Sequence, residues 1–570
     1  MSDKLVEYRH ADPPLPDHNT IWPLYGAGFE NLGQDGKPIE VPLPEIAPDQ
    51  LLVRHDAVGI CFSDIKVIKL GQQHPRIYRN MQTSPVVLGH EVSMTVVKVG
   101  EQLKDQYHVG DRFIIQADVY VKGVGYAYGY EIEGGFSKYG LIDQRILNGD
   151  EGSYLLPLKD TTGYVESALT EPWACVIAAY RLKYRTTLKS GGTTWIIGTD
   201  ANDARPYTIS SGFDAASHPA QLLLTDVPAH FAEWLRGRAA ELGITVTIVD
   251  DISQPPVSAI DDIILLGADV ARIEQASPHL GNFGVFAIIA EQPLSRIAQV
   301  DIGRVHYNRW LYVGGADPDI ARAYADHPVR SELQSGGRAW FIGAAGPMGR
   351  MHVQRAIEAQ QPPAMIVCTD VSDHRLEDLR LTFEADAVAR GIEFICINPM
   401  NAGAAERLAA FKERGFDDVV VLAPVPRLIS EGATYLAKGG VMNVFAGVAR
   451  GTMAALDLSD VYRKGARYIG HSGSMMDDIR ITLQQAESGV LSPIRAVAAV
   501  GSLSAFRDGL KAVEDAVFPG KVVIFPHIKE MPLTPLPDLK DVLPTVYAKL
   551  RDGREWTSEA EEEFLKLMLP

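Results

Sequence analysis

Three side chains of types that bind zinc lie in separate segments of the chain. Cys61 lies in GICFSDIK, His90 in SPVVLGHEVS and Glu171 in LTEPWACV. A thiolate, an imidazole and a carboxylate can each ligate zinc at about 2.0–2.3 Å, and three protein ligands with one open position are typical of a catalytic ion. Glu91, beside His90, is a candidate fourth ligand or a supporting acid that moves when substrate enters. Such an ion would act as a Lewis acid on a substrate oxygen.

A glycine-rich turn suggests a second kind of chemistry. The strand-like AWFIG runs into the turn GAAGPMG (343–349) and then into a helical pattern. Glycines in such a turn let the backbone approach a pyrophosphate at the helix N-terminus. The next strand ends at Asp370, where an acid can bind the ribose hydroxyls and would repel a 2′-phosphate. The pattern predicts an NAD site at Gly343, Gly346, Pro347, Met348, Gly349 and Asp370.

The elements that must position these residues change along the chain. The first part reads as β-rich, with short apolar runs between Gly and Pro. Later, apolar runs alternate with amphipathic stretches, as in a parallel sheet covered by helices. We expect a β-rich catalytic domain over 1–185, two α/β units over 186–332 and 333–475, and a return to the catalytic domain with a helical tail over 476–570.

The two α/β units are predicted copies of each other. GGTTWIIG (191–198) matches GGRAWFIG (336–343), and VDIGRVHYNRWLYVGG (300–315) matches LDLSDVYRKGARYIGH (456–471), with two further matched segments between them in the same order. The first copy lacks the glycine turn and has Asp200, Asp203 and Pro206 there. Carboxylates would repel a pyrophosphate. The first copy is therefore interpreted as a structural relic or spacer, or as a unit that has acquired another ligand.

Composition excludes several classes of protein. The 570-residue chain has a formal net charge of −18, which argues against nucleic-acid binding. No window is apolar enough to span a membrane, and the N-terminal segment lacks a signal-peptide pattern. The four cysteines are scattered, so a disulfide framework is not expected and a cytoplasmic location is predicted.

The sequence motifs around the candidate ligands resemble those of a known family. GxCxSD, GHE, a VGDR strand and EP at the start of an apolar helix closely resemble the zinc-containing medium-chain dehydrogenase superfamily. Within it, EPWAC and GHE are similar to the sorbitol and threonine dehydrogenase branch and to related sugar-phosphate reductases. The resemblance covers about 50–180 and 336–525, the latter ending in FPGKVVIFPH.

The resemblance implies a fold and residue roles. The fold class would be α/β, with a GroES-like β-rich catalytic domain and two tandem Rossmann-type doubly wound parallel-sheet units. Cys61, His90 and Glu171 match the zinc ligands, and Glu91 the acid after the histidine. Ser63 matches the hydroxyl that relays the substrate proton, and Asp64 the acid that orients the ligands. Residues 116–136 lack the cysteines that hold a second zinc in many relatives, so one catalytic zinc and no structural zinc is expected.

These observations predict a zinc-dependent oxidoreductase that transfers hydride between NAD(H) and a secondary alcohol or ketone. The expected substrate is a polyol, sugar or sugar derivative, and a homo-oligomer, dimer or tetramer, is expected. Two alternatives stay open: an epimerase or dehydratase that retains NAD, and a sensor or scaffold with a vestigial zinc site. His471 is a candidate for the cleft, and Cys175 is expected to be a buried thiol.

Overall fold

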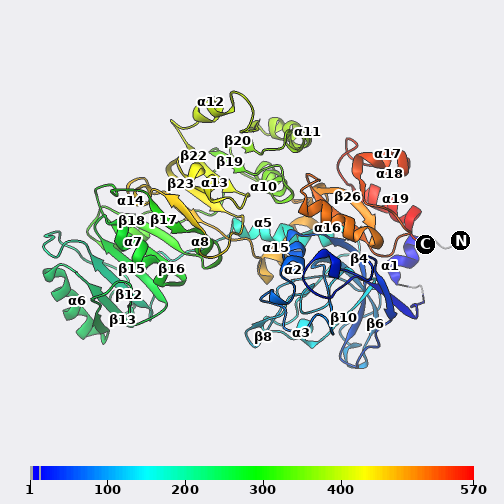
Figure 1. Cartoon of the computed structure of the whole chain (residues 1–570), viewed down its shortest axis with the longest axis horizontal. Helices are drawn as coiled ribbons and strands as arrows, with labels where there is room; N and C mark the ends of the chain where they lie inside the picture. The colour runs from blue at the N-terminus through cyan, green and yellow to red at the C-terminus, as the bar shows by residue number, and fades with distance from the viewer. Residues whose placement is uncertain (1–3, 12–13) are drawn as a thin grey trace.

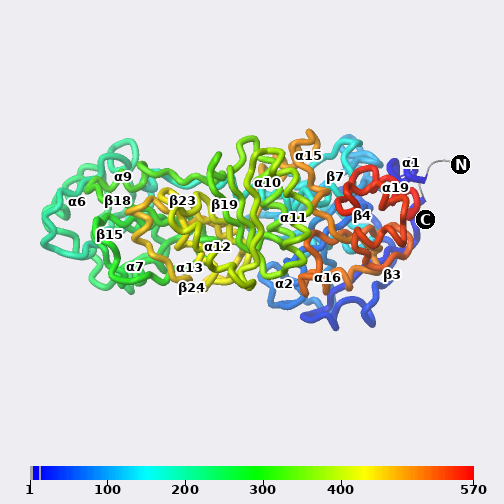
Figure 2. Tube along the Cα trace, turned by 90° about the horizontal axis from the view of Figure 1, so that it is seen from above, coloured from blue at the N-terminus to red at the C-terminus, as the bar shows by residue number. Residues whose placement is uncertain are grey.

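Three bodies lie in a row along the long axis of the molecule (Figures 1 and 2). The computed structural model describes residues 4–11 and 14–570. A β-rich body, built from both ends of the chain, occupies one end. The second unit (residues 333–475) lies in the middle, and the first unit (residues 186–332) lies at the far end. No described helix combines the length and apolarity needed to cross a bilayer.

The β-rich body is organised by an eight-stranded sheet of order β11-β7-β6-β4-β27-β26-β28, with β10 also paired to β4. Its strands are β4 (Leu51–Gly59), β6 (Glu91–Val99), β7 (Arg112–Ile115), β10 (Tyr139–Ile142), β11 (Leu155–Pro157), β26 (Val497–Ser502), β27 (Lys521–Phe525) and β28 (Thr534–Pro535). Every residue of the central strand β4 is buried. Because β27 pairs with β4, with Val523 opposite Gly59, the late chain returns beside the Cys61 segment.

The two α/β units contain six-stranded parallel sheets of the same topology. The orders are β14-β13-β12-β15-β16-β18 and β21-β20-β19-β22-β23-β25, which is the 3-2-1-4-5-6 order of a doubly wound fold. The first sheet comprises β12 (Thr193–Gly198), β13 (Gln221–Thr225), β14 (Thr245–Ile248), β15 (Ile260–Leu266), β16 (Leu280–Ile289) and β18 (Leu311–Gly315); the second comprises β19 (Arg338–Ile342), β20 (Met365–Thr369), β21 (Glu393–Ile397), β22 (Phe416–Val421), β23 (Leu436–Val444) and β25 (Arg467–Ile469). The predicted fold class is confirmed.

The units differ at the first crossover. In the second unit, α10 (Pro347–Glu358) connects β19 to β20. In the first unit, the connection over 199–220, all of it described, contains no helix. Pro206 removes a backbone donor and disfavours a helix there, and the Tyr207 hydroxyl donates to Asp203 at 2.6 Å to fold the loop on itself. The helices that cover the sheets elsewhere are α6 (Ala229–Leu242), α7 (Val270–Ala276), α9 (Ile320–Ala325), α11 (Asp373–Ala389), α12 (Ala404–Ala409) and α13 (Pro426–Ala433).

One α-helix of the β-rich body, α5 (Thr170–Ala179), packs against the second unit, and the others pack on one another. α5 packs against both α10 and α15 (Met476–Glu487). α2 (Phe62–Leu70) packs against α16 (Phe506–Glu514). The tail helix α19 (Ser558–Met568) is tied to α4 (Tyr164–Ala168), because Glu561 accepts hydrogen bonds from the first two backbone N–H groups of α4 at 2.7 and 2.9 Å. This acid at a helix N-terminus complements the helix dipole.

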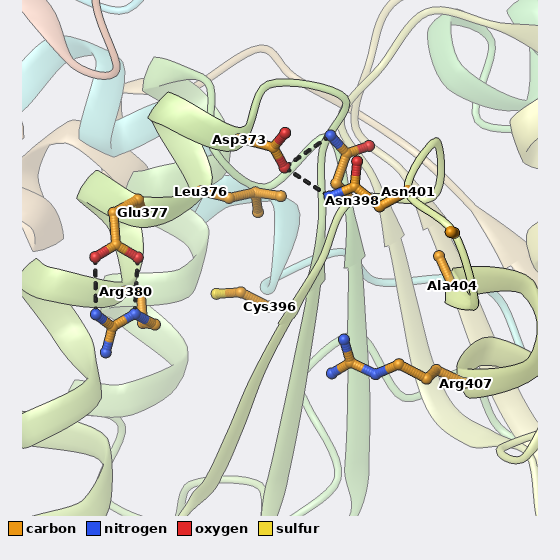
Figure 3. A pocket seen from close by; sticks show the side chains of 10 residues that line it. Asp373, Leu376, Glu377, Arg380, Cys396, Asn398, Asn401, Ala404 and Arg407 are labelled. Carbon is orange, nitrogen blue, oxygen red and sulfur yellow. Dashed lines mark hydrogen bonds and ion pairs between the residues drawn. The ribbon is translucent and has the colours of Figure 1, made fainter.

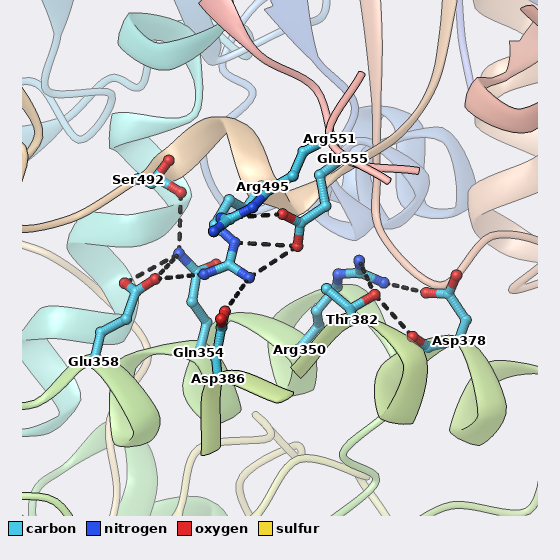
Figure 4. A network of polar contacts seen from close by, with 10 residues as sticks. All are labelled: Arg350, Gln354, Glu358, Asp378, Thr382, Asp386, Ser492, Arg495, Arg551 and Glu555. Carbon is cyan, nitrogen blue, oxygen red and sulfur yellow. Dashed lines mark hydrogen bonds and ion pairs between the residues drawn. The ribbon is translucent and has the colours of Figure 1, made fainter. Parts of the chain in front are cut away.

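A charge network joins the tail to the second unit (Figure 4). Arg495 donates to Glu555 at 2.9 and 3.1 Å, to Glu358 at 3.0 Å and to Asp386 at 2.7 Å. The side chains of Arg495 and Glu555 are 9% and 4% exposed. Glu358 and Asp386 come from α10 and α11, so one guanidinium bridges three segments that are distant in sequence.

Candidate metal and cofactor site

Three of the predicted metal-site residues meet at one point. The ligand atoms of Cys61, His90 and Glu91 lie within 4.8 Å of one another. Cys61 is the N-cap of α2, and Glu91 is the first residue of β6, so a helix start and a strand start fix the group. Among the described residues, this is the one such close group of His, Cys, Asp or Glu side chains.

Asp64 holds two of these residues in place. Its carboxylate accepts a hydrogen bond from the backbone N–H of Cys61 at 2.9 Å, and its other oxygen lies 3.3 Å from His90 Nδ1. Asp64 is fully buried. A carboxylate behind a ligating histidine fixes the ring and its tautomer, which leaves the other ring nitrogen, Nε2, as the one available to a metal.

Glu91 is held by a residue that the sequence argument missed. Lys521 donates to Glu91 Oε1 at 2.5 Å and to the carbonyl of Ile60 at 2.9 Å. The other carboxylate oxygen, Oε2, is buried and has no hydrogen-bond partner. The motif FPGKVVIFPH contained Lys521, but only the pairing of β27 with β4 places it beside Glu91.

Glu171 lies near the group but outside the three that converge. It is 9% exposed in the first turn of α5, close enough to His90 and Glu91 for their charges to act on it. Burial raises the pKa of Glu171 to about 7, and His90 opposes the rise. Cys175, one turn further along α5, is half-buried, and burial raises the pKa of its thiol. Ser63, in the first turn of α2, is also half-buried.

The loop over 116–136 forms part of the surroundings of this site. The Tyr130 ring stacks on His90 with centroids 5.7 Å apart and on His74 at 5.1 Å. Asp118, at the start of the loop, is ion-paired with Arg76 and lies close enough to Glu171 to influence its pKa. These contacts favour a contribution of this loop to the cleft.

The residues fit a zinc ion. A thiol, an imidazole with Asp64 behind it and a carboxylate with one unpartnered oxygen form a donor set that zinc prefers. A buried oxygen with no partner is costly unless a cation or donor satisfies it. Glu171, predicted as the third ligand, lies outside this group, and its place in the donor set stays a prediction.

The glycine turn of the second unit fits a dinucleotide. Gly343 has φ +82°, and a Cβ on Gly349 would lie 2.4 Å from the carbonyl oxygen of Ala344, so both positions require glycine. A Cβ on Gly346 would meet no atom within 4 Å, which leaves open space at the N-terminus of α10. Pro347 is the first residue of that helix, where its missing N–H costs nothing, and Met348 follows it.

The corresponding position in the first unit is closed. Asp226, the counterpart of Asp370, pairs with Arg272 at 2.8 Å. Arg272 also donates to the carbonyl of Gly198 at 2.7 Å, where the strand enters the turn. A guanidinium therefore links the strand-end acid of the first unit to the end of β12; the degeneracy of this unit stays a prediction.

Asp370 is already bonded in the second unit. Its carboxylate accepts from the backbone N–H of Ala345 and of Ser372, both at 3.2 Å, and from Arg375 at 2.9 Å. The first two bonds fix the acid against the turn. The third brings a cation beside the position where a 2′-phosphate would lie, a feature that the sequence argument did not anticipate.

Replacing Asp370 with serine should weaken NADH binding by about 10- to 100-fold, because hydrogen bonds to a charged group are lost. NADPH binding should improve at the same time, since Arg375 is freed to pair with the 2′-phosphate. Fluorescence titration of both cofactors measures the change. In the matched variant Asp370→Ser/Arg375→Ala the NADPH gain should disappear; an unaltered NADH to NADPH ratio in both variants would contradict the assignment.

A separate cavity of about 320 Å³ lies beside β21, between α11 and α12 (Figure 3). Its polar groups largely satisfy one another: Asp373 accepts from Asn398 and Asn401 at 2.9 and 3.0 Å, and Arg380 donates to Glu377 at 2.8 and 2.9 Å. The cavity is lined entirely by the second unit and includes none of the predicted site residues. We assign it no ligand.

One domain of the chain matches a known family, and nearly the whole chain aligns with known proteins. Residues 47–148 match the family of alcohol dehydrogenase GroES-like domains. The chain is 23% identical to mannitol-1-phosphate 5-dehydrogenase of Aliivibrio fischeri, covering 92% of this chain and 93% of that protein. It is 21% identical to L-sorbose 1-phosphate reductase of Klebsiella pneumoniae, covering 92% and 93%. Among solved structures, 2R,3R-butanediol dehydrogenase of Bacillus subtilis aligns with a TM-score of 0.49 at 15% identity, covering 89% of this chain and 99% of that chain.

Residues 47–148 resemble an alcohol dehydrogenase GroES-like domain, and the relatives named above are a dehydrogenase and a reductase, which supports an oxidoreductase. The mannitol-1-phosphate dehydrogenase and the L-sorbose 1-phosphate reductase both align over nearly the whole length of the chain.

Proposed function

We propose that the chain is a zinc-dependent dehydrogenase that transfers hydride between NAD(H) and a secondary alcohol or ketone of a polyol, sugar or sugar derivative. The observation that carries the proposal is the convergence of Cys61, His90 and Glu91, with Asp64 behind them and Glu171 alongside. The open turn at Gly346 supports the cofactor part. Zinc, when bound, would polarise the substrate oxygen, and NAD would accept or return the hydride.

The chain's own residues have distinct tasks in this proposal. Ser63, two residues after Cys61 in the first turn of α2, exchanges a proton with the substrate hydroxyl. Asp64 keeps Cys61 and His90 oriented through its two oxygens. Lys521 balances the charge of Glu91, so that the buried carboxylate does not repel the electrons of an incoming substrate oxygen.

A substrate panel tests the proposal. Hexitol phosphates and ketose phosphates lead the panel, because the relatives that align over the full length bear such names, and each is paired with its unphosphorylated form. NADH formation or consumption at 340 nm, with about one zinc per chain, is the expected result. Isomerised or dehydrated product with retained NAD and no net change at 340 nm would favour the epimerase or dehydratase alternative. A zinc-free chain inactive on the whole panel would favour the sensor or scaffold.

A further inference from the structure

The first and second units contact each other through equivalent elements. β17 (Ala298–Asp301) of the first unit pairs antiparallel with β24 (Met453–Leu456) of the second. Each of these strands precedes a short helix in its own unit, α8 (Ile302–Tyr307) and α14 (Ser459–Arg463) respectively. The internal repeat matches Val300 to Leu456, so β17 and β24 are counterparts of each other.

The register of this pairing is symmetric. In the repeat, Ala298 corresponds to Ala454 and Val300 corresponds to Leu456. Ala298 lies opposite Leu456, and Val300 lies opposite Ala454. Gln299 and Ala455 correspond to each other in the repeat, and they also lie opposite each other. In an isologous, two-fold interface every contact occurs twice, with the two partners exchanged. The pairing of β17 with β24 has this property. The axis passes beside Gln299 and Ala455.

The reciprocity extends beyond the two strands. α14 packs on β18, and α8 packs on β25, so each unit places the same helix on the other unit's last strand. β18 and β25, the edge strands of the two sheets, also contact each other. One hydrophobic core contains residues from both sides: Val300, Ile302, Val305, Leu456, Leu458 and Val461. Such an apolar, symmetric face resembles an obligate subunit interface.

We propose that the first unit is a built-in replacement for a second subunit, which closes the two-fold face of the second unit and supports its cofactor edge. Its degenerate cofactor turn fits this role, because a partner that supplies a surface needs no dinucleotide of its own. Any assembly of chains must then use faces other than β17, β24 and the edge strands β18 and β25.

His306, in α8 of the first unit, is the side chain that reaches the cofactor edge. It is fully buried, and its Nδ1 lies 2.9 Å from the carbonyl oxygen of Val444 and its Nε2 3.1 Å from Ser472 Oγ. Burial lowers the pKa of His306 to about 4, so the ring is neutral at pH 7. Because a carbonyl only accepts, Nδ1 donates to Val444 and Nε2 accepts from the Ser472 hydroxyl.

The two hydrogen bonds of His306, to Val444 and to Ser472, lie at the edge of the second sheet that faces the cleft. Val444 is the last residue of β23, and Ser472 follows β25, so His306 ties together the carboxyl ends of two parallel strands. Doubly wound sheets bind cofactors at that edge. Two residues beyond Ser472, Ser474 accepts hydrogen bonds from Gln116 of the β-rich body at 3.1 and 3.2 Å. His306 is thus a positioning residue for a segment between the two halves of the site, a role that rests on the proposed function.

Cysteines at the axis test the interface without reference to activity. In Gln299→Cys/Ala455→Cys the two side chains lie on directly opposed residues, and mild oxidation of the purified full-length chain should give an intramolecular disulfide at the mass of one chain. Gln299→Cys alone should give no linked dimer above the level of the unsubstituted chain, whose four thiols are the control. Linked dimers from Gln299→Cys alone would mean that two chains pair through β17 and would overturn the proposal.

The role of His306 is tested by cofactor affinity. His306→Ala should weaken NADH binding by about tenfold in a fluorescence titration and raise the KM for cofactor, with zinc content unchanged. His306→Asn, which can still donate to Val444, should recover part of the affinity. His218→Ala, in the same unit but bonded only to its neighbour Pro219, is the matched control.

The remaining outcomes are also decisive. If His306→Ala does not fold, Ser472→Ala, which removes only the hydroxyl that donates to Nε2, replaces it. Cofactor affinity and KM within twofold of the parent in a folded variant would reject the positioning role. If instead the chain binds neither NAD(H) nor zinc, the proposed function fails while the disulfide result still decides the interface.

Discussion

Substitution of Cys61 by serine should leave the purified chain with less than about one tenth of an equivalent of zinc and lower kcat/KM by ~10³-fold. The thiolate is the soft ligand of the group, and a serine hydroxyl stays protonated near pH 7 and binds zinc weakly. Loss of the Lewis acid removes several kcal/mol of transition-state stabilisation, and each 1.4 kcal/mol corresponds to tenfold in rate. Elemental analysis and initial rates at 340 nm give the two readouts.

Cys175→Ser is the matched control for this experiment. Its thiol also lies close to the site, near enough to Cys61 and Glu171 for their charges to influence it, yet it does not belong to the group whose donors converge. Zinc content should therefore stay at that of the parent and kcat/KM within a few-fold. Retention of a full zinc equivalent in Cys61→Ser, or equal losses in both variants, would refute the assignment of Cys61 as a ligand.

The sequence predicted the local parts of this site better than its long-range parts. Cys61, Asp64 and His90 lie in short motifs whose chemistry can be recognised from neighbouring residues, and the structure brings them together. Lys521 could not be assigned a role, because its contact with Glu91 depends on a strand pairing between residues far apart in the chain. The stacking of Tyr130 on His90 could not be predicted either, because it brings together two segments that are 40 residues apart in the chain.

The fold shows the same division between local pattern and long-range packing. The repeated strand motifs predicted two parallel units, and the identical strand orders follow from the repeated order of strands and crossovers. How the two units pack together was not predicted, because β17 and β24 are short and their alternating buried and exposed residues fit many partners. The bond from Arg375 to Asp370 was missed for another reason: it depends on a side-chain conformation rather than on a residue pattern.

Replacement of Arg495 by methionine should lower the free energy of unfolding of the tail by about 3–5 kcal/mol, because removing one partner of a buried charge network leaves the others uncompensated. Glu555 would then be buried at 4% exposure without the cation that neutralises it, and Glu358 and Asp386 would lose their shared donor. Because methionine keeps much of the side-chain volume of arginine, the loss of unfolding free energy measures the missing charge rather than a new cavity. Urea unfolding and hydrogen exchange in α19 measure the effect. Hydrogen exchange is needed because a chain of several bodies need not unfold in one step, and it reports on the tail separately.

The exposed arginine Arg380 offers a control of the same chemistry. It also bonds two carboxylates, Glu377 and Glu384, but all three side chains are between 39% and 54% exposed. Solvent screens such pairs, so Arg380→Met should cost much less stability than Arg495→Met. Adding Glu555→Gln to Arg495→Met should recover part of the loss, because the neutral amide no longer needs the cation. Equal losses of unfolding free energy in Arg380→Met and Arg495→Met would show that Arg495 contributes no more than a surface ion pair. A larger loss in Arg495→Met that Glu555→Gln partly restores would show that the charge of Arg495 attaches the tail to the second unit.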